Sequence, residues 1–161
     1  MTSLILMLGE ESLIKIIITL LGIAGYLVAR HIHHEKQSAR PLVCPIQFDC
    51  DAVVHSNYAT LFGVHVEVYG MFYYIFITFS YLTSLLLSTV LPHSIPNALT
   101  GFIVITSLGA FLFSMYLIGV QLFILKKWCS WCLVSAIICI LIFAFTVVAY
   151  DFSSLAAFYI K

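Results

Sequence analysis

Residues 68–125 read VYGMFYYIFITFSYLTSLLLSTVLPHSIPNALTGFIVITSLGAFLFSMYLIGVQLFIL, and these 58 residues contain no Asp, Glu, Lys or Arg. At about 1.5 Å per residue, one helix of this length would far exceed the roughly 30 Å hydrocarbon core of a bilayer. The stretch therefore predicts two membrane crossings. Pro92 and Pro96 favour a break in its middle, because proline removes a helical hydrogen-bond donor. We expect spans at about 68–91 and 97–125.

Two further apolar stretches flank this one. The uncharged residues after Lys127 predict a span at about 129–150, and residues 13–29 predict another, with Lys15 placed to reach the interface. The whole chain is 63% hydrophobic and 9% charged, with a mean hydropathy of +1.12. Soluble domains carry about a quarter charged residues, so this composition excludes one. The fold class predicted is all-α, an integral membrane four-helix bundle.

The sequence also predicts the domain organisation, and its charge excludes one class of partner. No repeat or linker is visible, which predicts a single membrane domain over residues 1–161, surrounded by lipid. Four crossings place both termini at one end, and a long extramembrane loop at 30–67 with a short turn at 126–130 at the other. Lys and Arg total 7, as do Asp and Glu, so no basic surface is available for a phosphate backbone and no nucleic-acid partner is expected.

The chemistry is expected at two close cysteine pairs at the loop end. Cys129 and Cys132, here called the helix pair, form a Cys-x-x-Cys at the start of the fourth span, and this spacing allows a small disulfide ring. Free N–H groups at a helix N-terminus, with Lys126 and Lys127 nearby, predict a lowered pKa for Cys129. Haem attachment is excluded because Leu133, not His, follows the pair.

Cys44 and Cys50, here called the loop pair, lie in the long loop, where a partner's thiol could reach them. Two pairs at one end suggest a relay of disulfides. Cys139 follows Cys132 by seven residues on the same helical face, and we interpret it as a packing residue. Two other interpretations stay open at this point. The four paired cysteines could form a zinc site in a small metal-binding or transport protein, or they could be incidental in a structural subunit.

Aromatic and basic residues gather at the same end. We interpret five aromatic residues as an interfacial belt: Tyr69, Tyr73, Tyr74, Trp128 and Trp131. We interpret a second group as a solvated collar past span one: Arg30, His31, His33 and His34. His65 and Glu67 stand at the entry to span two, where an ionisable residue at membrane depth is a candidate functional residue. His65 could supply a proton to a bound acceptor.

Several short motifs carry a family resemblance. In chain order they are Cys44, Cys50, Ser56, Tyr58-Ala59, Phe62-Gly63, Gly70 and Cys129-Ser130-Trp131-Cys132-Leu133. Over about residues 10–150 this order closely resembles the vitamin K epoxide reductase family, most of all its prokaryotic single-domain members. The resemblance implies a quinone-dependent thiol oxidoreductase, with a ubiquinone, menaquinone or vitamin K type of quinone inside the bundle. It also implies a thioredoxin-fold thiol oxidase as partner, expected as a separate chain because no such domain follows residue 161, in contrast to fused relatives.

The resemblance also implies roles for single residues. By position, Cys132 would face the quinone, Cys129 would exchange disulfides with Cys50, and Cys44 would meet the partner. Ser56 matches a loop serine near the active cysteines. From their position at the entry to span two, and not from the resemblance, we expect two more residues at the quinone beside Cys132 and Ser56: His65 and Glu67.

Four positions depart from the family pattern. His65 and Glu67 stand where prokaryotic relatives usually have proline and a small apolar residue. Val66 and Ala136 stand where the vertebrate enzymes have the Asn and Tyr that contact vitamin K. These last two differences argue against an epoxide substrate and leave quinone reduction as the expected reaction.

The orientation in the cell membrane has two opposing indications. The loop end carries five positive charges: Arg30, Lys36, Arg40, Lys126 and Lys127. The other end carries Lys15 and Lys161, so the positive-inside rule places the cysteines in the cytosol. Most of the family places them on the oxidising side. We expect the exoplasmic side, with the inverted orientation as the alternative, since hyperthermophiles keep disulfides inside the cell.

Overall fold

The computed structural model describes residues 2–38, 44, 49–88 and 97–159, with side chains for 12–38, 44, 49–86 and 100–150. Its elements, in chain order, are α1 (Thr2–Gln37), α2 (Cys50–Val54), η1 (Asn57–Ala59), β1 (Thr60–Leu61), β2 (Val64–His65), α3 (Val66–Ser88), α4 (Asn97–Gly119), the π-helical turn η2 (Val120–Leu125) and α5 (Ser130–Tyr159).

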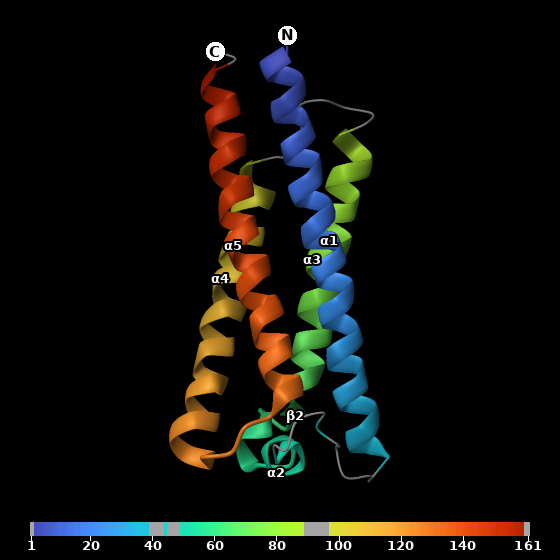
Figure 1. The fold of residues 1–161 in the computed structure, drawn as a ribbon, viewed down its shortest axis with the longest axis vertical. Coiled ribbons are helices and arrows are strands. Elements are labelled where there is room, and N and C mark those ends of the chain that lie inside the picture. Colours follow the sequence, from blue (N-terminus) through green and yellow to red (C-terminus); the bar gives the residue numbers. More distant parts are fainter. Residues whose placement is uncertain (1, 39–43, 45–48, 89–96, 160–161) are drawn as a thin grey trace.

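Four of these helices are long and apolar enough to cross a membrane. The candidate spans are Ser12–Gln37, Val66–Leu86, Thr100–Leu125 and Ser130–Tyr150. They run side by side, with both termini at one end and the short elements α2 and β2 at the other (Figure 1). The all-α four-helix membrane bundle predicted from the sequence is confirmed. We call the end that holds α2 the cysteine end.

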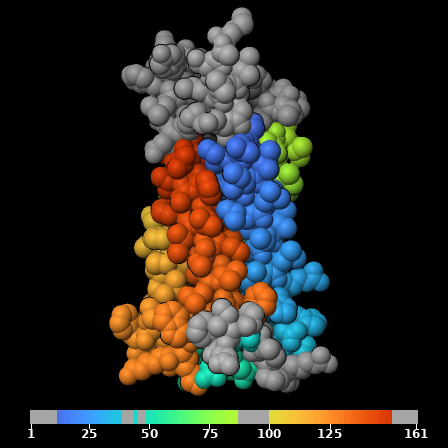
Figure 2. Space-filling model, in the orientation of Figure 1, coloured from blue at the N-terminus to red at the C-terminus, as the bar shows by residue number. Residues whose placement is uncertain are grey.

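The helices pack unevenly around the bundle. α1 contacts α3 and α5, and α4 contacts α5. The side chains of α1 and α5 form much of the face seen in Figure 2. Gly22 and Gly25 bring α1 close to α3, since a Cβ at either position would overlap Thr78 or Tyr74. Small residues allow such close approach between membrane helices. The buried core of this bundle includes Ile18, Ile77 and Ile142, one each from α1, α3 and α5.

The helices extend well beyond the predicted spans at three ends: α1 begins at Thr2 and ends at Gln37, against predicted limits of 13 and 29, and α5 ends at Tyr159, against a predicted limit of 150. α1 continues to Gln37, eight residues past the predicted limit of span one, because charged side chains end a membrane span without breaking a helix. The next strong helix breaker in the sequence is Pro41. Span three ends in η2, where Lys126 takes a left-handed conformation with φ of 49°. The break predicted at Pro92 and Pro96 lies outside the described residues.

Residues 49–65, which we call the cap segment, lie across the cysteine end. They contain α2, η1 and a two-stranded antiparallel hairpin in which Thr60 pairs with His65 and Leu61 pairs with Val64. Phe62 and Gly63 form the two-residue turn with φ of 52° and 79°, as tight hairpins require. The hairpin is a small addition to the predicted fold. On its inner side, the cap segment buries Val53 and Val54 of α2 against the bundle.

Candidate active site

The loop pair is a disulfide whose two sulfurs differ in exposure. Cys44 and Cys50 are bonded, with their Cα atoms 5.9 Å apart, a usual separation for a disulfide. Cys50 begins α2 and is almost completely buried, and its Sγ lies 3.8 Å from the Ser130 hydroxyl at the start of α5. Cys44 is only partly buried. The bond therefore presents one sulfur toward the surface and the other toward the helix pair.

The helix pair is a dithiol at the N-terminal end of α5. Cys129 is fully buried and Cys132 is half-buried, and both are free thiols. The Cys132 backbone N–H donates a hydrogen bond to Cys129 Sγ at 3.3 Å, and the Cys129 N–H donates to Gln121 Oε1 at 3.4 Å. Gln121 is buried in η2, so the π-helical turn contacts the helix pair through this hydrogen bond to Cys129. No pattern in the sequence indicated this contact.

The two pairs meet in one buried cluster. Cys50 and Cys129 pack with Ile32, Val53 and Val54, and Cys44 and Cys132 pack against the edge of this cluster. The cluster therefore joins α1, α2 and the turn before α5. The arrangement brings together all four cysteines that the sequence singled out.

The pKa of Cys129 lies below that of an ordinary thiol. A hydrogen bond from the Cys132 side chain lowers it most, backbone N–H groups of Cys132 and Trp131 add to the effect, and burial opposes it. The direction agrees with the sequence-based expectation, and the cause is local hydrogen bonding at the helix N-terminus. A thiolate at Cys129 is the form that attacks a disulfide, and it is also the better leaving group.

An apolar pocket of about 400 Å³ lies directly behind the helix pair. Cys132 forms part of its wall, and α1, α3, α4, η2, α5 and the cap segment supply the rest. The volume lies within the usual range for small-molecule sites, which are mostly apolar with a few placed polar groups. Six lining residues show this mixture: Tyr73, Tyr74, Phe113, Ser114, Ser135 and Cys139.

Two tyrosines supply polar groups in this pocket. The Tyr74 hydroxyl donates to the Ser135 carbonyl at 2.8 Å and shares a hydrogen bond with the Ser135 hydroxyl at 2.9 Å. The Tyr73 hydroxyl donates to Ser107 Oγ at 3.4 Å and so links α3 to α4. Interpreting these tyrosines as an interfacial belt was wrong, because their rings face the interior. Tyr69 also lines the pocket, but it is exposed, as a belt residue should be.

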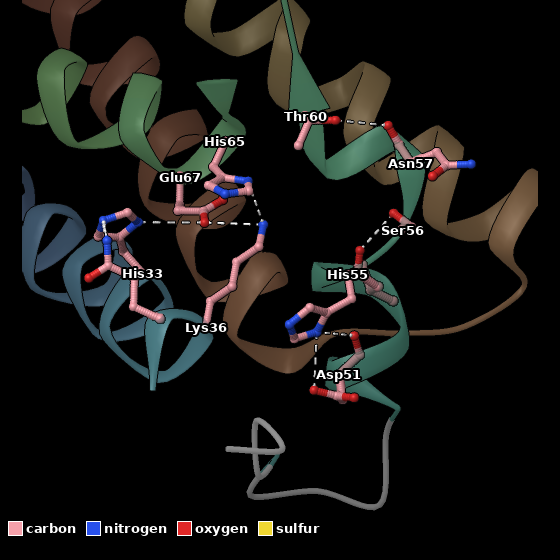
Figure 3. A network of polar contacts seen from close by, with 11 residues as sticks. His33, Lys36, Asp51, His55, Ser56, Asn57, Thr60, His65 and Glu67 are labelled. Atoms are coloured by element: carbon pink, nitrogen blue, oxygen red, sulfur yellow. Dashed lines mark hydrogen bonds and ion pairs between the residues drawn. The ribbon is translucent and has the colours of Figure 1, made fainter. Parts of the chain in front are cut away.

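Of the three further residues expected at a quinone, two line the pocket. Ser56 lines it, although its hydroxyl donates to the Val53 carbonyl at 2.7 Å. Glu67 also lines it and is paired with Lys36. His65 is exposed on β2 and lies outside the residues that line the pocket, with Nδ1 3.0 Å from Lys36 Nζ (Figure 3).

The arrangement of the cysteines in this site does not favour metal binding. Cys44 and Cys50 are bonded to each other rather than available as thiolate ligands. Within residues 2–38, 44, 49–88 and 97–159, no group of three or more His, Cys, Asp or Glu side chains is arranged to hold a metal. The zinc interpretation therefore receives no support from the described residues.

The fold and the site together define a class of protein, the membrane-embedded oxidoreductases that act on thiols and disulfides. The sequence model of the vitamin K epoxide reductase family matches residues 13–147, which include both cysteine pairs and most of the chain. The chain belongs to the vitamin K epoxide reductase family. The resemblance drawn from its motifs is thereby confirmed. No curated protein sequence matches the chain.

Proposed function

We propose that this protein oxidises a thioredoxin-fold partner and passes the two electrons to a membrane quinone, thereby supporting protein disulfide formation. One observation carries the proposal. Cys132 forms part of the wall of an apolar pocket inside the membrane bundle, while its neighbour Cys129 shares a buried cluster with Cys50 of the loop pair. A path for electrons thus runs from the cap segment to the pocket through adjacent sulfurs.

The first exchange occurs at the loop pair. A thiolate of the partner attacks Cys44, because this sulfur is the more exposed one and Cys50 is buried. Cys50 leaves as a thiolate, and the partner's second thiol then releases Cys44 and completes the partner's disulfide. The loop pair has gained two electrons and is a dithiol.

The second exchange occurs inside the buried cluster. Cys50 attacks Cys129 in the oxidised helix pair and Cys132 leaves, after which Cys44 attacks Cys50 and frees Cys129. The lowered pKa of Cys129 favours this last step, because a more acidic thiol leaves faster. The products are a loop disulfide and a helix-pair dithiol, which is the state of the four cysteines in the structure.

The pocket fits a quinone ring. A bound quinone would accept two electrons and two protons, and the chain's own residues provide the walls, the thiols and the polar contacts. The apolar lining shields the ring, and Cys132 presents its sulfur to the pocket. We assign Cys132, Ser56 and Glu67 to the pocket wall, with His65 acting on it through Lys36.

For the orientation, we propose that the cysteine end faces the exoplasmic side. The loop pair is a disulfide in the structure, and disulfides persist in oxidising compartments. A membrane-impermeant thiol reagent tests this placement: after reduction it should label Cys44 in intact cells. Labelling only after permeabilisation would show the inverted orientation.

Replacing each cysteine of the helix pair tests the function. Cys129→Ser and Cys132→Ser should each abolish quinone-dependent oxidation of a dithiol, because neither variant can form the ring. The two variants differ in what they accumulate, since Cys132→Ser leaves a Cys50–Cys129 bond that no thiol of the helix pair can resolve. Turnover is measured in membranes with added quinone, and free thiols are counted before and after. Retained turnover in either folded variant would remove the helix pair from the reaction.

A further inference from the structure

A polar network joins the end of α1 to the start of α3 beside the pocket (Figure 3). Glu67 Oε1 lies 3.3 Å from Lys36 Nζ and 3.7 Å from His33 Nδ1. His65 approaches Lys36 from β2, and the Gln37 amide contacts the other ring nitrogen of His33 at 2.9 Å. Two titratable side chains, Lys36 and His33, thus approach the Glu67 carboxylate, and a third, His65, contacts Lys36.

Glu67 is unusual within this network because it contacts the polar network on one side and lines the apolar pocket on the other. Its side chain is only 6% exposed, and it is the one charged residue among those lining the pocket. Its Oε1 forms an ion pair with Lys36 but accepts no hydrogen bond from the described residues, so a lone pair of this buried oxygen stays available. A buried carboxylate is costly unless its charge is used or compensated.

Two other members of the network, His65 and His33, are accessible to solvent. The His65 side chain is exposed and the His33 side chain is 25% exposed, while Lys36 between them is 9% exposed. The contacts therefore form two short routes from the solvent to Glu67: one through His33, the other through His65 and Lys36. On the pocket side, Cys132 lies within electrostatic reach of both Glu67 and Lys36.

The proton balance of the proposed reaction requires such a route. When Cys129 reacts as a thiolate, the form that its lowered pKa favours, and Cys132 reacts as a thiol, oxidation forms one S–S bond and releases two electrons and one proton. Full reduction of a quinone takes up two electrons and two protons. One additional proton must enter the pocket from outside for each turnover, and the apolar walls supply no other carboxyl group.

We propose that Glu67 delivers this second proton, receiving it from the solvent through His33, Lys36 and His65. The inference rests on the proposed function and deepens it by assigning a proton-transfer residue. Each cycle returns Glu67 to its starting carboxylate form: the carboxylate takes up one proton from the histidine side and then gives it to the pocket. Two further residues, His33 and His65, thereby gain a role that neither has as a pocket wall.

A purely structural role for the ion pair makes a different prediction. If Lys36 and Glu67 only tie α1 to α3, their loss would loosen the cap segment and slow every disulfide exchange in the protein. If Glu67 moves a proton, its loss would slow the quinone step alone. The two roles are therefore separable by measuring the exchange without any quinone.

The experiment compares Glu67→Gln with Glu35→Gln. Glu35 lies near the end of α1 and outside the pocket, so this variant removes a nearby carboxylate that the proposal does not use. Purified, quinone-free protein in lipid nanodiscs gives two readouts. Rapid mixing with a dithiol measures the transfer of electrons to the helix pair. Infrared difference spectra recorded on reduction of the helix pair follow the carboxyl stretch of Glu67, which should report a proton gained by this side chain before the quinone step. Ubiquinone and menaquinone analogues then give kcat and KM.

We expect Glu67→Gln to lower kcat about a hundredfold, the usual contribution of a proton-transfer group. KM and the quinone-free exchange should stay within a few-fold, and the infrared carboxyl signal should disappear. Glu67→Asp should keep the signal and part of the rate, and Glu35→Gln should behave as the parent protein.

Three results would overturn the proposal: a parent-like kcat in Glu67→Gln, equal slowing of the quinone-free exchange, or no carboxyl signal in the parent protein. If Glu67→Gln does not fold, Glu67→Asp decides, because a parent-like rate without a carboxyl signal contradicts proton delivery. A parent protein that reduces neither quinone defeats the proposed function instead, and the infrared signal then still decides whether Glu67 takes up a proton.

Discussion

The loop pair and the helix pair have the same chemistry but opposite surroundings. Cys44 and Cys50 are held in a disulfide on the cap segment, with one sulfur turned toward the surface. Cys129 and Cys132 are free thiols, one fully buried and the other part of the pocket wall. The loop pair is suited to a large protein partner and the helix pair to a small ligand within the bundle.

In the proposed function, this difference allows one chain to join two compartments. A protein cannot enter a pocket of about 400 Å³, and a membrane quinone does not leave the bilayer to meet a soluble disulfide. The buried contact between Cys50 and the start of α5 is a place where the two environments touch. The predictions below separate the two pairs by what can reach them.

Cys44→Ala should have the largest selective effect. Oxidation of a protein partner should be lost, because the loop pair can no longer present a disulfide at the surface. The rate of oxidation of a small dithiol should stay within a few-fold of the parent rate. A small dithiol can enter the pocket and attack Cys132, with Cys129 as the leaving thiolate. Initial rates with both substrates measure the ratio. Equal loss of both rates in a folded variant would mean that the two pairs act as a single site.

The pH dependence of the helix pair should be the next largest effect. Because the pKa of Cys129 is lowered, its thiolate should persist below the ordinary thiol value of about 8.5 and be lost only as the pH falls through the lower pKa. Cys132→Ala removes the strongest hydrogen bond to Cys129 and should shift its titration upward, toward the ordinary value. Thiolate absorbance, with a variant lacking Cys129 as the blank, reports the titration. An unchanged titration in Cys132→Ala would contradict the assigned cause.

Lys127→Met should have a smaller effect on the exchange between the pairs. Lys127 Nζ lies 2.6 Å from Asp49 Oδ2, so this ion pair ties the turn before Cys129 to the residue before Cys50. Both side chains are exposed, and such pairs contribute about 0–1 kcal/mol. We expect the exchange to slow by a few-fold and to lose its dependence on salt. Lys126→Met is the matched control. The same loss in both variants would show a general charge effect.

Cys139→Ala should have the smallest effect of the cysteine replacements. The side chain is buried at the pocket wall, seven residues beyond Cys132, and loses only a small apolar group. Turnover should stay within a few-fold of the parent protein. If quinone reduction fails in a folded Cys139→Ala variant, the helix pair is not the only thiol that serves the pocket, and the comparison with the loop pair must be redrawn.

Much of the fold could be predicted because charges mark where a chain can cross a membrane. Glu67, Lys126 and Lys127 bound the uncharged stretches, and those bounds placed the four helices and gathered the cysteines at one end. The length of α1 could not be predicted in this way, since its helix runs on through charged residues to Gln37. Hydropathy marks the membrane boundary and not the end of the helix.

The inner faces of the helices could not be predicted, for a physical reason. Lipid tails are as apolar as a protein core, so the hydrophobic pattern does not show which side of a membrane helix faces its neighbours. Tyr74 therefore resembled an interfacial residue although its hydroxyl bonds to Ser135 in the interior. The pairing of Lys36 with Glu67 was also hidden, because it depends on how the cap segment folds back.

The transfer of electrons between the pairs through Cys50 and Cys129 is the step on which the proposed relay depends. The most direct test is disulfide mapping by peptide mass spectrometry in a Cys44→Ser/Cys132→Ser variant, after mild oxidation of the membranes with diamide. We predict an intramolecular Cys50–Cys129 disulfide, with Cys139 still reduced. Free Cys50 and Cys129 thiols after oxidation, in a variant shown to be folded, would contradict the relay.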